Sequence, residues 1–177
     1  MKHTLSFFFL LLIVGSSFGQ PVEEIRKRFH QAVLSPDSIE NYHQYIVKVD
    51  LSTPTIVAYR AAGEAMKAQI IWNPLAKLGQ VHRYEKMILE AIEMDMDNLE
   101  IRFLRFAIEY HLPRFLRKSK HLEEDRDFIV ENLWRCKEMN IDPEFESYIT
   151  YFMNDTGMLL PRQITVMKEL LSEPQTD

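Results

Sequence analysis

The sequence predicts an all-α domain of seven to eight helices arranged in antiparallel pairs. Apolar residues recur every three or four positions along most of the chain, which is the spacing of one helix face. Asn-Gly and Asp-Gly, the usual signals of a β-hairpin, do not occur. Helix starts are marked by a capping residue directly before proline, at Ser35-Pro36, Thr53-Pro54, Asn73-Pro74 and Asp142-Pro143.

Four helices are expected in the first half of the chain. The first has its apolar stripe over residues 22–33, the second starts at Ser35-Pro36 and has its stripe over 39–49, and the third and fourth span 54–70 and 74–94. Residues 45–49 are β-branched and alternate, but no partner strand is in sight, so they are assigned to the second helix. The third helix is rich in Ala and contains Gly63, which lets a neighbouring helix approach closely. In the fourth helix the residues expected to face inward are Leu75, Leu78, Tyr84, Met87, Ile88 and Ala91.

The second half predicts four more helices. Asn98 caps a fifth over residues 99–111, which must end before Pro113. A sixth spans 122–138, a seventh begins at Pro143 and ends near Gly157, and an eighth spans 161–171. No linker interrupts residues 20–171, which we interpret as a single domain, and residues 172–177 are expected to form a flexible polar tail.

Residues 1–19 have the layout of a secretory signal peptide. Lys2 is followed by an apolar run over residues 7–14 and then by small residues at cleavage spacing. An uncleaved anchor is the alternative, but the apolar run is too short to span a bilayer comfortably. We therefore expect an exported protein, periplasmic or extracellular, that is soluble and has no membrane span after cleavage. Cys136, the single cysteine, allows no internal disulfide and is expected to be a small buried side chain.

Composition and motifs narrow the function only by exclusion. The formal net charge is −5, whereas nucleic-acid binding needs a basic surface, so no nucleic-acid partner is expected. The sequence has no Gly-rich phosphate loop, nucleophile elbow or convincing triad pattern, and it predicts no cofactor.

Residues 91–100 resemble the junction between two tetratricopeptide repeats (TPRs). Ala91 matches the small residue near the end of one helix, and Asp95, Asp97 and Asn98 match the turn before the next. The sequence departs from the pattern at three positions: Tyr84 and Phe106 stand where small residues are expected, and Met96 stands where proline is usual. Residues 98–130 also resemble a block of small exported helical proteins of bacteria. The repeat resemblance implies a right-handed stack of helix pairs whose concave groove binds peptides or protein segments and is not usually catalytic.

The most unusual local chemistry lies between residues 102 and 127, where six bases oppose one acid before the sign reverses. A basic patch could steer an anionic partner such as an acidic peptide or glycan. It predicts a recognition surface for a protein or peptide at Arg102, Arg105, Tyr110, Arg114 and Phe115. The alternative is that these bases are solvated or pair with the following acids. Because the helix around Arg102 and Arg105 is apolar on nearly every side, at least one of the two is expected to be partly buried against a carboxylate.

A metal site is the competing hypothesis for the same region. His121 and Asp125 are four residues apart, a spacing that places two ligands on one helix face, and Glu124 lies beside them. These residues would serve a small secreted metal-dependent hydrolase, the alternative to the leading prediction of a non-enzymatic binding or assembly module. Trp72 and Trp134 could line a groove, but aromatic residues at helical spacing are more often core, so we expect them inside. The oligomeric state is left open.

Overall fold

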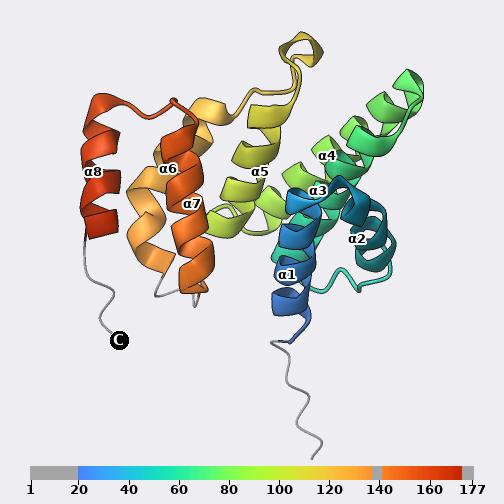
Figure 1. Cartoon of the computed structure of the whole chain (residues 1–177), viewed down its shortest axis with the longest axis horizontal. Coiled ribbons are helices and arrows are strands. Elements are labelled where there is room, and N and C mark those ends of the chain that lie inside the picture. The colour runs from blue at the N-terminus through green and yellow to red at the C-terminus, as the bar shows by residue number, and fades with distance from the viewer. Residues whose placement is uncertain (1–19, 137–140, 173–177) are drawn as a thin grey trace, which may run out of the picture.

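The computed structural model describes residues 20–136 and 141–172, and these residues form eight α-helices joined by short turns (Figure 1). The predicted signal peptide lies outside the described residues. None of the described helices is both long and apolar enough to cross a membrane. The bounds are α1 Gln20–Leu34, α2 Ile39–Ile46, α3 Pro54–Ile70, α4 Pro74–Met94, α5 Leu99–His111, α6 Leu122–Asn132, α7 Pro143–Asp155 and α8 Pro161–Ser172, with 3₁₀ turns η1 Pro36–Ser38, η2 Arg114–Leu116 and η3 Leu133–Cys136.

Side-chain caps begin the helices where the sequence predicts them. The Thr53 hydroxyl accepts a hydrogen bond from the amide of Ile56, and Asn73 Oδ1 accepts from the amides of Leu75 and Ala76. Asn98 and Asp142 cap α5 and α7 in the same way. The exception is Ser35, whose side chain makes no cap bond and is followed by η1 before α2 begins. The other differences are that α2 ends at Ile46 and that α6 gives way to η3 after Asn132.

Two apolar cores share α5. Ile101 and Leu104 face a first core built from α1 to α4, in which Tyr59 and Tyr84 are fully buried. Phe103 and Phe106 face a second core built with α6, α7 and α8. In the second core the ring of Phe103 meets three aromatic rings of α7 edge-on, at centroid distances of 5.6 to 5.9 Å, an arrangement that stabilises beyond simple area burial. Helix α5 therefore fixes the two halves relative to each other.

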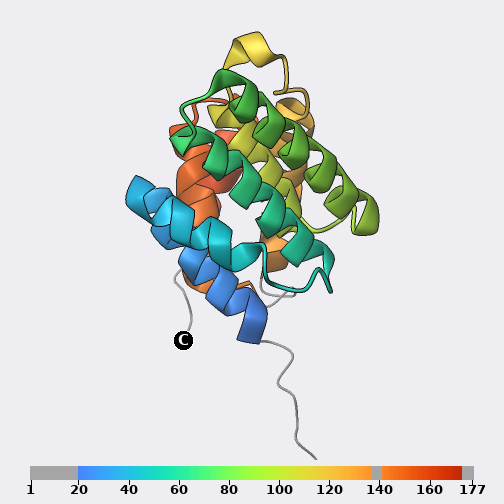
Figure 2. The ribbon, with the colours of Figure 1, turned by 90° about the vertical axis from the view of Figure 1, so that its right-hand side faces the viewer.

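Helix α1 lies beside α2 and α3 (Figures 1 and 2), and single side chains of α1 reach α5 and α7. Arg26 makes a two-pronged ion pair with the buried Glu100 of α5, both contacts being 2.7 Å, and the Tyr59 hydroxyl donates to the same carboxylate at 2.6 Å. The ring of His30 meets that of Tyr148 on α7 at 5.9 Å. A buried carboxylate needs partners of this kind, because an unpaired one would carry a large desolvation cost.

The close approach predicted from the small residues of the third helix occurs at Gly63, between α2 and α3. A Cβ atom added to Gly63 would lie 3.0 Å from the Ile46 side chain and 3.3 Å from the Tyr42 ring. Those contacts are tighter than ordinary van der Waals contact, so glycine allows α2 to sit where it does.

Four apolar residues expected inside are exposed instead. Leu75 and Leu78 lie on the first two turns of α4, and Trp72 lies in the preceding turn. The α3–α4 hairpin projects past the other helices (Figure 1), so no third helix covers its end. Trp134 sits on η3 and is also exposed, donating its indole N–H to the carbonyl of Glu131. Helical spacing identifies the face of a helix but cannot show how far along the helix its neighbours reach.

Candidate functional site

Arg102 and Arg105, the centre of the predicted recognition surface, are held by carboxylates of α6. Arg105 Nε and Nη2 each donate to Asp125 at 2.6 Å, and neither side chain is more than 3 % exposed. Arg102 donates to Asp125 at 3.0 Å, contacts Glu124 and lies over the Phe128 ring at 4.7 Å. The prediction that at least one of the two arginines is buried against a carboxylate is therefore confirmed.

The charges in this cluster neutralise one another. Burial alone would lower the pKa of Arg105, but the hydrogen bonds and charge of Asp125 outweigh it and raise that pKa above its ordinary value. The pKa of Glu124 is lowered, chiefly by its hydrogen bond from Arg102. Arg105 cannot reach a partner at the surface without taking two hydrogen bonds from the buried Asp125 and leaving it with Arg102 alone, so its place in the fold is that of a structural ion pair.

His121, Glu124 and Asp125, the candidate metal ligands, point to different partners. The backbone amide of His121 donates to Glu109 Oε2 at 2.9 Å, and its ring Nδ1 lies 2.7 Å from Oε1 of the same carboxylate. Glu124 and Asp125 face the two arginines instead. Over residues 20–136 and 141–172, no three His, Cys, Asp or Glu side chains are grouped so that they could hold a metal ion.

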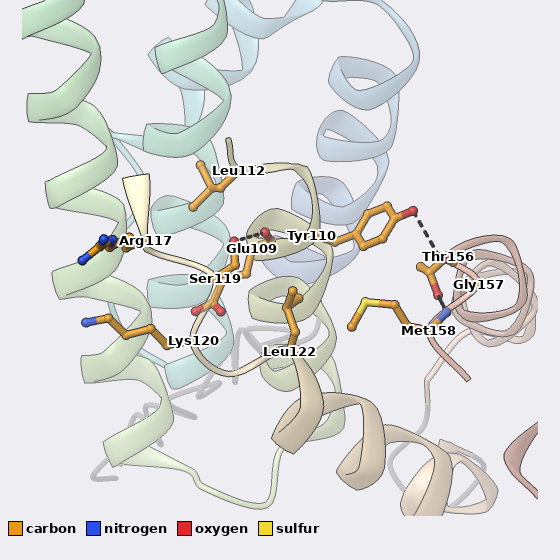
Figure 3. Close-up of a pocket in the computed structure, with 10 residues that line it drawn as sticks. All are labelled: Glu109, Tyr110, Leu112, Arg117, Ser119, Lys120, Leu122, Thr156, Gly157 and Met158. Carbon is orange, nitrogen blue, oxygen red and sulfur yellow. Dashed lines mark hydrogen bonds between the residues drawn. The ribbon is translucent and has the colours of Figure 1, made fainter. Parts of the chain in front are cut away.

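Beside this cluster lies a pocket of about 730 Å³, between the end of α5, the 112–121 loop, the start of α6 and the α7–α8 turn (Figure 3). Its lining combines apolar, polar and basic side chains. The lining residues are Glu109, Tyr110, Leu112, Arg117, Ser119, Lys120, Leu122, Thr156, Gly157 and Met158.

Hydrogen bonds fix two sides of the pocket. The Tyr110 hydroxyl donates to the carbonyl of Thr156 at 3.3 Å, which joins α5 to the α7–α8 turn. The Ser119 hydroxyl donates to the carbonyl of Glu109 at 2.7 Å and ties down the 112–121 loop. Between these two attachments Figure 3 shows the side chains of Leu122 and Met158, and it shows Leu112 on the outer side of the Ser119–Glu109 bond.

The basic rim of the pocket differs from the neighbouring arginine cluster. Arg117 and Lys120 are exposed, and neither makes a hydrogen bond or ion pair with any residue that the structure describes. In Figure 3 both head groups extend to the same side, away from Tyr110 and Met158. Arg117 also has φ of 52°, the left-handed region that L-residues with a side chain rarely adopt. Strain of this kind persists where surrounding structure enforces it and is frequent at functional sites.

The predicted site residues thus separate into three groups. Arg102 and Arg105 are neutralised by α6, whereas Tyr110 lines the pocket. Phe115 projects from η2, and nothing is described of the Arg114 side chain beyond its place on that turn. Sequence reasoning missed Met158 and Gly157, which the α7–α8 turn brings to the pocket from some forty residues away. The run of bases did include Arg117 and Lys120, but no local signal shows which bases lack a carboxylate.

Comparison of the chain with protein-family models, with curated proteins and with solved structures finds no match.

Proposed function

We propose that this protein is an exported, non-enzymatic binding module that takes an acidic peptide or protein segment at the pocket beside α5. One observation carries the proposal: an apolar centre is bordered by Arg117 and Lys120, two cations with no partner among the described residues. Sites of this kind bury an apolar group and use a few polar ones for orientation. An acidic side chain next to an apolar one would meet both parts of the pocket.

The helix pairing supports a TPR-like stack as the frame of this module. Helices α3 and α4 pack as one pair and α5 and α6 as the next. At the junction between the pairs Ala91 is fully buried, and Asn98 Oδ1 accepts a hydrogen bond from the amide of Ile101. The bulky residues Tyr84 and Phe106 are buried near the same junction, so the proposed stack is a loosely related version of the repeat.

The position of α1 favours the pocket as the binding site over the concave groove that a stack of helix pairs would form. Helix α1 packs against α2 and α3 and reaches α5 and α7 through Glu100 and Tyr148, so these residues are already engaged by α1 and are not free to line a groove. The pocket lies at another edge, where α5 ends and the α7–α8 turn begins, and it remains open.

Nothing in the described residues favours the alternative of a metal-dependent hydrolase. His121 would have to leave Glu109, and Glu124 and Asp125 would have to leave two arginines, before the three could converge. Releasing Asp125 would also uncover the buried charge of Arg105.

The test is selection of peptides from a randomised library on the immobilised chain, followed by fluorescence anisotropy of a labelled selected peptide. We expect enrichment of Asp and Glu beside an apolar residue. Reversing both rim charges, with Arg117→Glu and Lys120→Glu, should weaken binding about tenfold. Lys27→Glu is the matched control, because Lys27 is an exposed base on α1 with no described partner and lies outside the pocket lining. Enrichment of basic peptides, or equal binding by the reversed variant, would contradict the proposal.

A further inference from the structure

The most exposed apolar side chains of the described residues gather on two turns. Trp72 is 97 % exposed, Phe115 82 % and Leu75 79 %, the three highest values among the large apolar residues. Trp72 lies in the turn between α3 and α4, Leu75 lies on the first turn of α4, and Phe115 belongs to η2 in the 112–121 loop. Single exposed apolar residues are ordinary, but three on adjacent turns indicate a contact surface.

The two turns lie at the same end of the molecule. Both turns stand at the upper end in Figure 1, and they remain together there after the quarter turn of Figure 2. An ion pair between Lys118 of the loop and Glu85 of α4 connects the two elements directly. We call this the tip end, defined by residues 65–84 and 110–122.

The tip end is the basic part of an acidic protein. Residues 65–84 and 110–122 contain seven of the 21 Lys and Arg residues and none of the 26 Asp and Glu residues. Three of these bases pair with acids from outside the two segments: Lys67 with Glu40, Arg83 with Glu64 and Lys118 with Glu85.

Three further bases of the tip end have no partner. Lys77, Arg117 and Lys120 are exposed and make no ion pair or hydrogen bond with any described residue. Uncompensated positive charge therefore surrounds the exposed apolar residues, although the formal net charge of the chain is −5.

We propose that the tip end docks on the surface of an anionic lipid bilayer, with Trp72, Leu75 and Phe115 entering the interfacial region. Trp is favoured at the level of the lipid head groups, because its ring is apolar and its indole N–H stays hydrated. Each Lys or Arg near an anionic surface adds an attraction that corresponds to about fivefold in partitioning. The two turns can enter together because they project at one end, whereas the acidic remainder of the chain stays away from the surface.

Charge also argues against a second copy of this chain as the occupant. Two tip ends brought together would oppose their unpaired bases, and like charges across an interface are unfavourable. A stable protein interface buries about 800 Å² on each partner. Three side chains on two separate turns offer a discontinuous apolar surface, which suits a fluid interface better than a fixed one.

The two tryptophans supply a direct test. In the chain 20–177, which contains every contact described above, Trp134→Phe leaves Trp72 as the single fluorophore, and Trp72→Phe leaves the exposed Trp134. Adding vesicles of phosphatidylglycerol and phosphatidylcholine should shift the Trp72 emission to shorter wavelength and expose it to quenching by brominated lipid. Trp134 should respond weakly, because η3 follows α6 at the end remote from the 112–121 loop.

Vesicle co-sedimentation tests the charge and the apolar residues separately. Lys77→Gln should lower partitioning about fivefold, and raising the salt concentration should lower it further. Trp72→Ser and Phe115→Ser should each lower it tenfold or more. Lys27→Gln is the matched control for charge and should leave partitioning unchanged. Circular dichroism melts verify that each variant is folded; because these residues are exposed, the melting temperature should not move.

Several outcomes would overturn the proposal. These are no partitioning into anionic vesicles at low salt, equal partitioning into pure phosphatidylcholine, or unchanged partitioning of the Trp72→Ser variant. Concentration-dependent dimerisation that disappears in Trp72→Ser would assign the tip end to a second copy instead. Lys77, Trp72 and Phe115 do not line the pocket, so these variants leave the proposed peptide binding intact, and the two proposals can fail independently.

Discussion

Two groups of basic residues lie within twenty positions of each other and have opposite environments. Arg102 and Arg105 project from α5 onto Asp125 and Glu124 of α6, where their charge is cancelled. Arg117 and Lys120, on the loop that joins the same two helices, meet no described carboxylate. The first group holds α5 and α6 together, and the second is available to a ligand or a surface.

The acids that pack against a run of basic residues decide which of its charges are neutralised. Asp125 is fully buried and accepts hydrogen bonds from both arginines of α5. The 112–121 loop extends beyond α6, and the one acid that reaches it from α4, Glu85, is taken by Lys118. Removing the acid from the first group, or relieving the backbone strain in the second, should change the stability of the protein in opposite directions.

The largest effect is expected from Asp125→Ala. Without this carboxylate, Arg105 stays buried with its main partner missing, and the free energy of unfolding should fall by about 3–5 kcal/mol. Urea unfolding followed by circular dichroism measures the change. Glu124→Ala is the matched control, because the Glu124 side chain is 57 % exposed, and it should cost about 0–1 kcal/mol. Equal losses in the two variants would show that burial does not distinguish the members of the cluster.

A smaller effect of opposite sign is expected at Arg117. Its positive φ costs a residue with a Cβ atom about 1–2 kcal/mol. Arg117→Gly removes that strain at some cost in chain entropy, so we expect the free energy of unfolding to rise by about 0.5–1 kcal/mol. Arg117→Ala retains the strain while removing the guanidinium, and it should be nearly neutral. A loss of stability in both variants would place Arg117 among the residues that hold the fold, alongside Arg105.

Most of the helical framework could be predicted because its signals are local. The Thr53, Asn73, Asn98 and Asp142 caps act within one turn of their own helices, and α4 and α5 have the predicted limits. The predictions of burial that were wrong depend on distant parts of the chain. Leu75 and Trp72 have the composition of core residues, but the hairpin that carries them extends past its neighbours. A helix-face pattern contains no information about where the next helix ends.

The candidate site was less predictable for the same reason. The apolar surroundings of Arg102 and Arg105 indicated that a carboxylate must lie nearby, but not that it would be Asp125. Tyr110 was named for the recognition surface, yet its neighbours Thr156 and Met158 come from the α7–α8 turn. Spacing along a chain can suggest two ligands on one helix turn, as at His121 and Asp125. The partners that separate them, Glu109 and Arg105, are supplied only by packing.

The smallest effect is expected at Glu124, where the pKa of the carboxyl group reports its contact with Arg102. Its pKa lies below the ordinary value of 4.5 because Arg102 donates to the ionised carboxylate, with Arg105 adding a smaller attraction. A lowered pKa stabilises the folded state above the unfolded pKa, and that stabilisation is lost as pH falls through the folded pKa. NMR titration of the Glu124 side chain should therefore give a midpoint below 4.5, and Arg102→Gln should raise it.

Because this carboxylate is exposed and screened by solvent, its contact with Arg102 should contribute less than about 1 kcal/mol to the free energy of unfolding. The stability difference between the wild-type protein and Glu124→Gln should accordingly be small above pH 5 and vanish below the folded pKa. A Glu124 midpoint that Arg102→Gln leaves unchanged would mean that Arg102 serves Asp125 alone. The part of the Arg102 guanidinium that faces Glu124 would then be available to a ligand. The bases available to a ligand would in that case include one on α5 as well as those of the 112–121 loop.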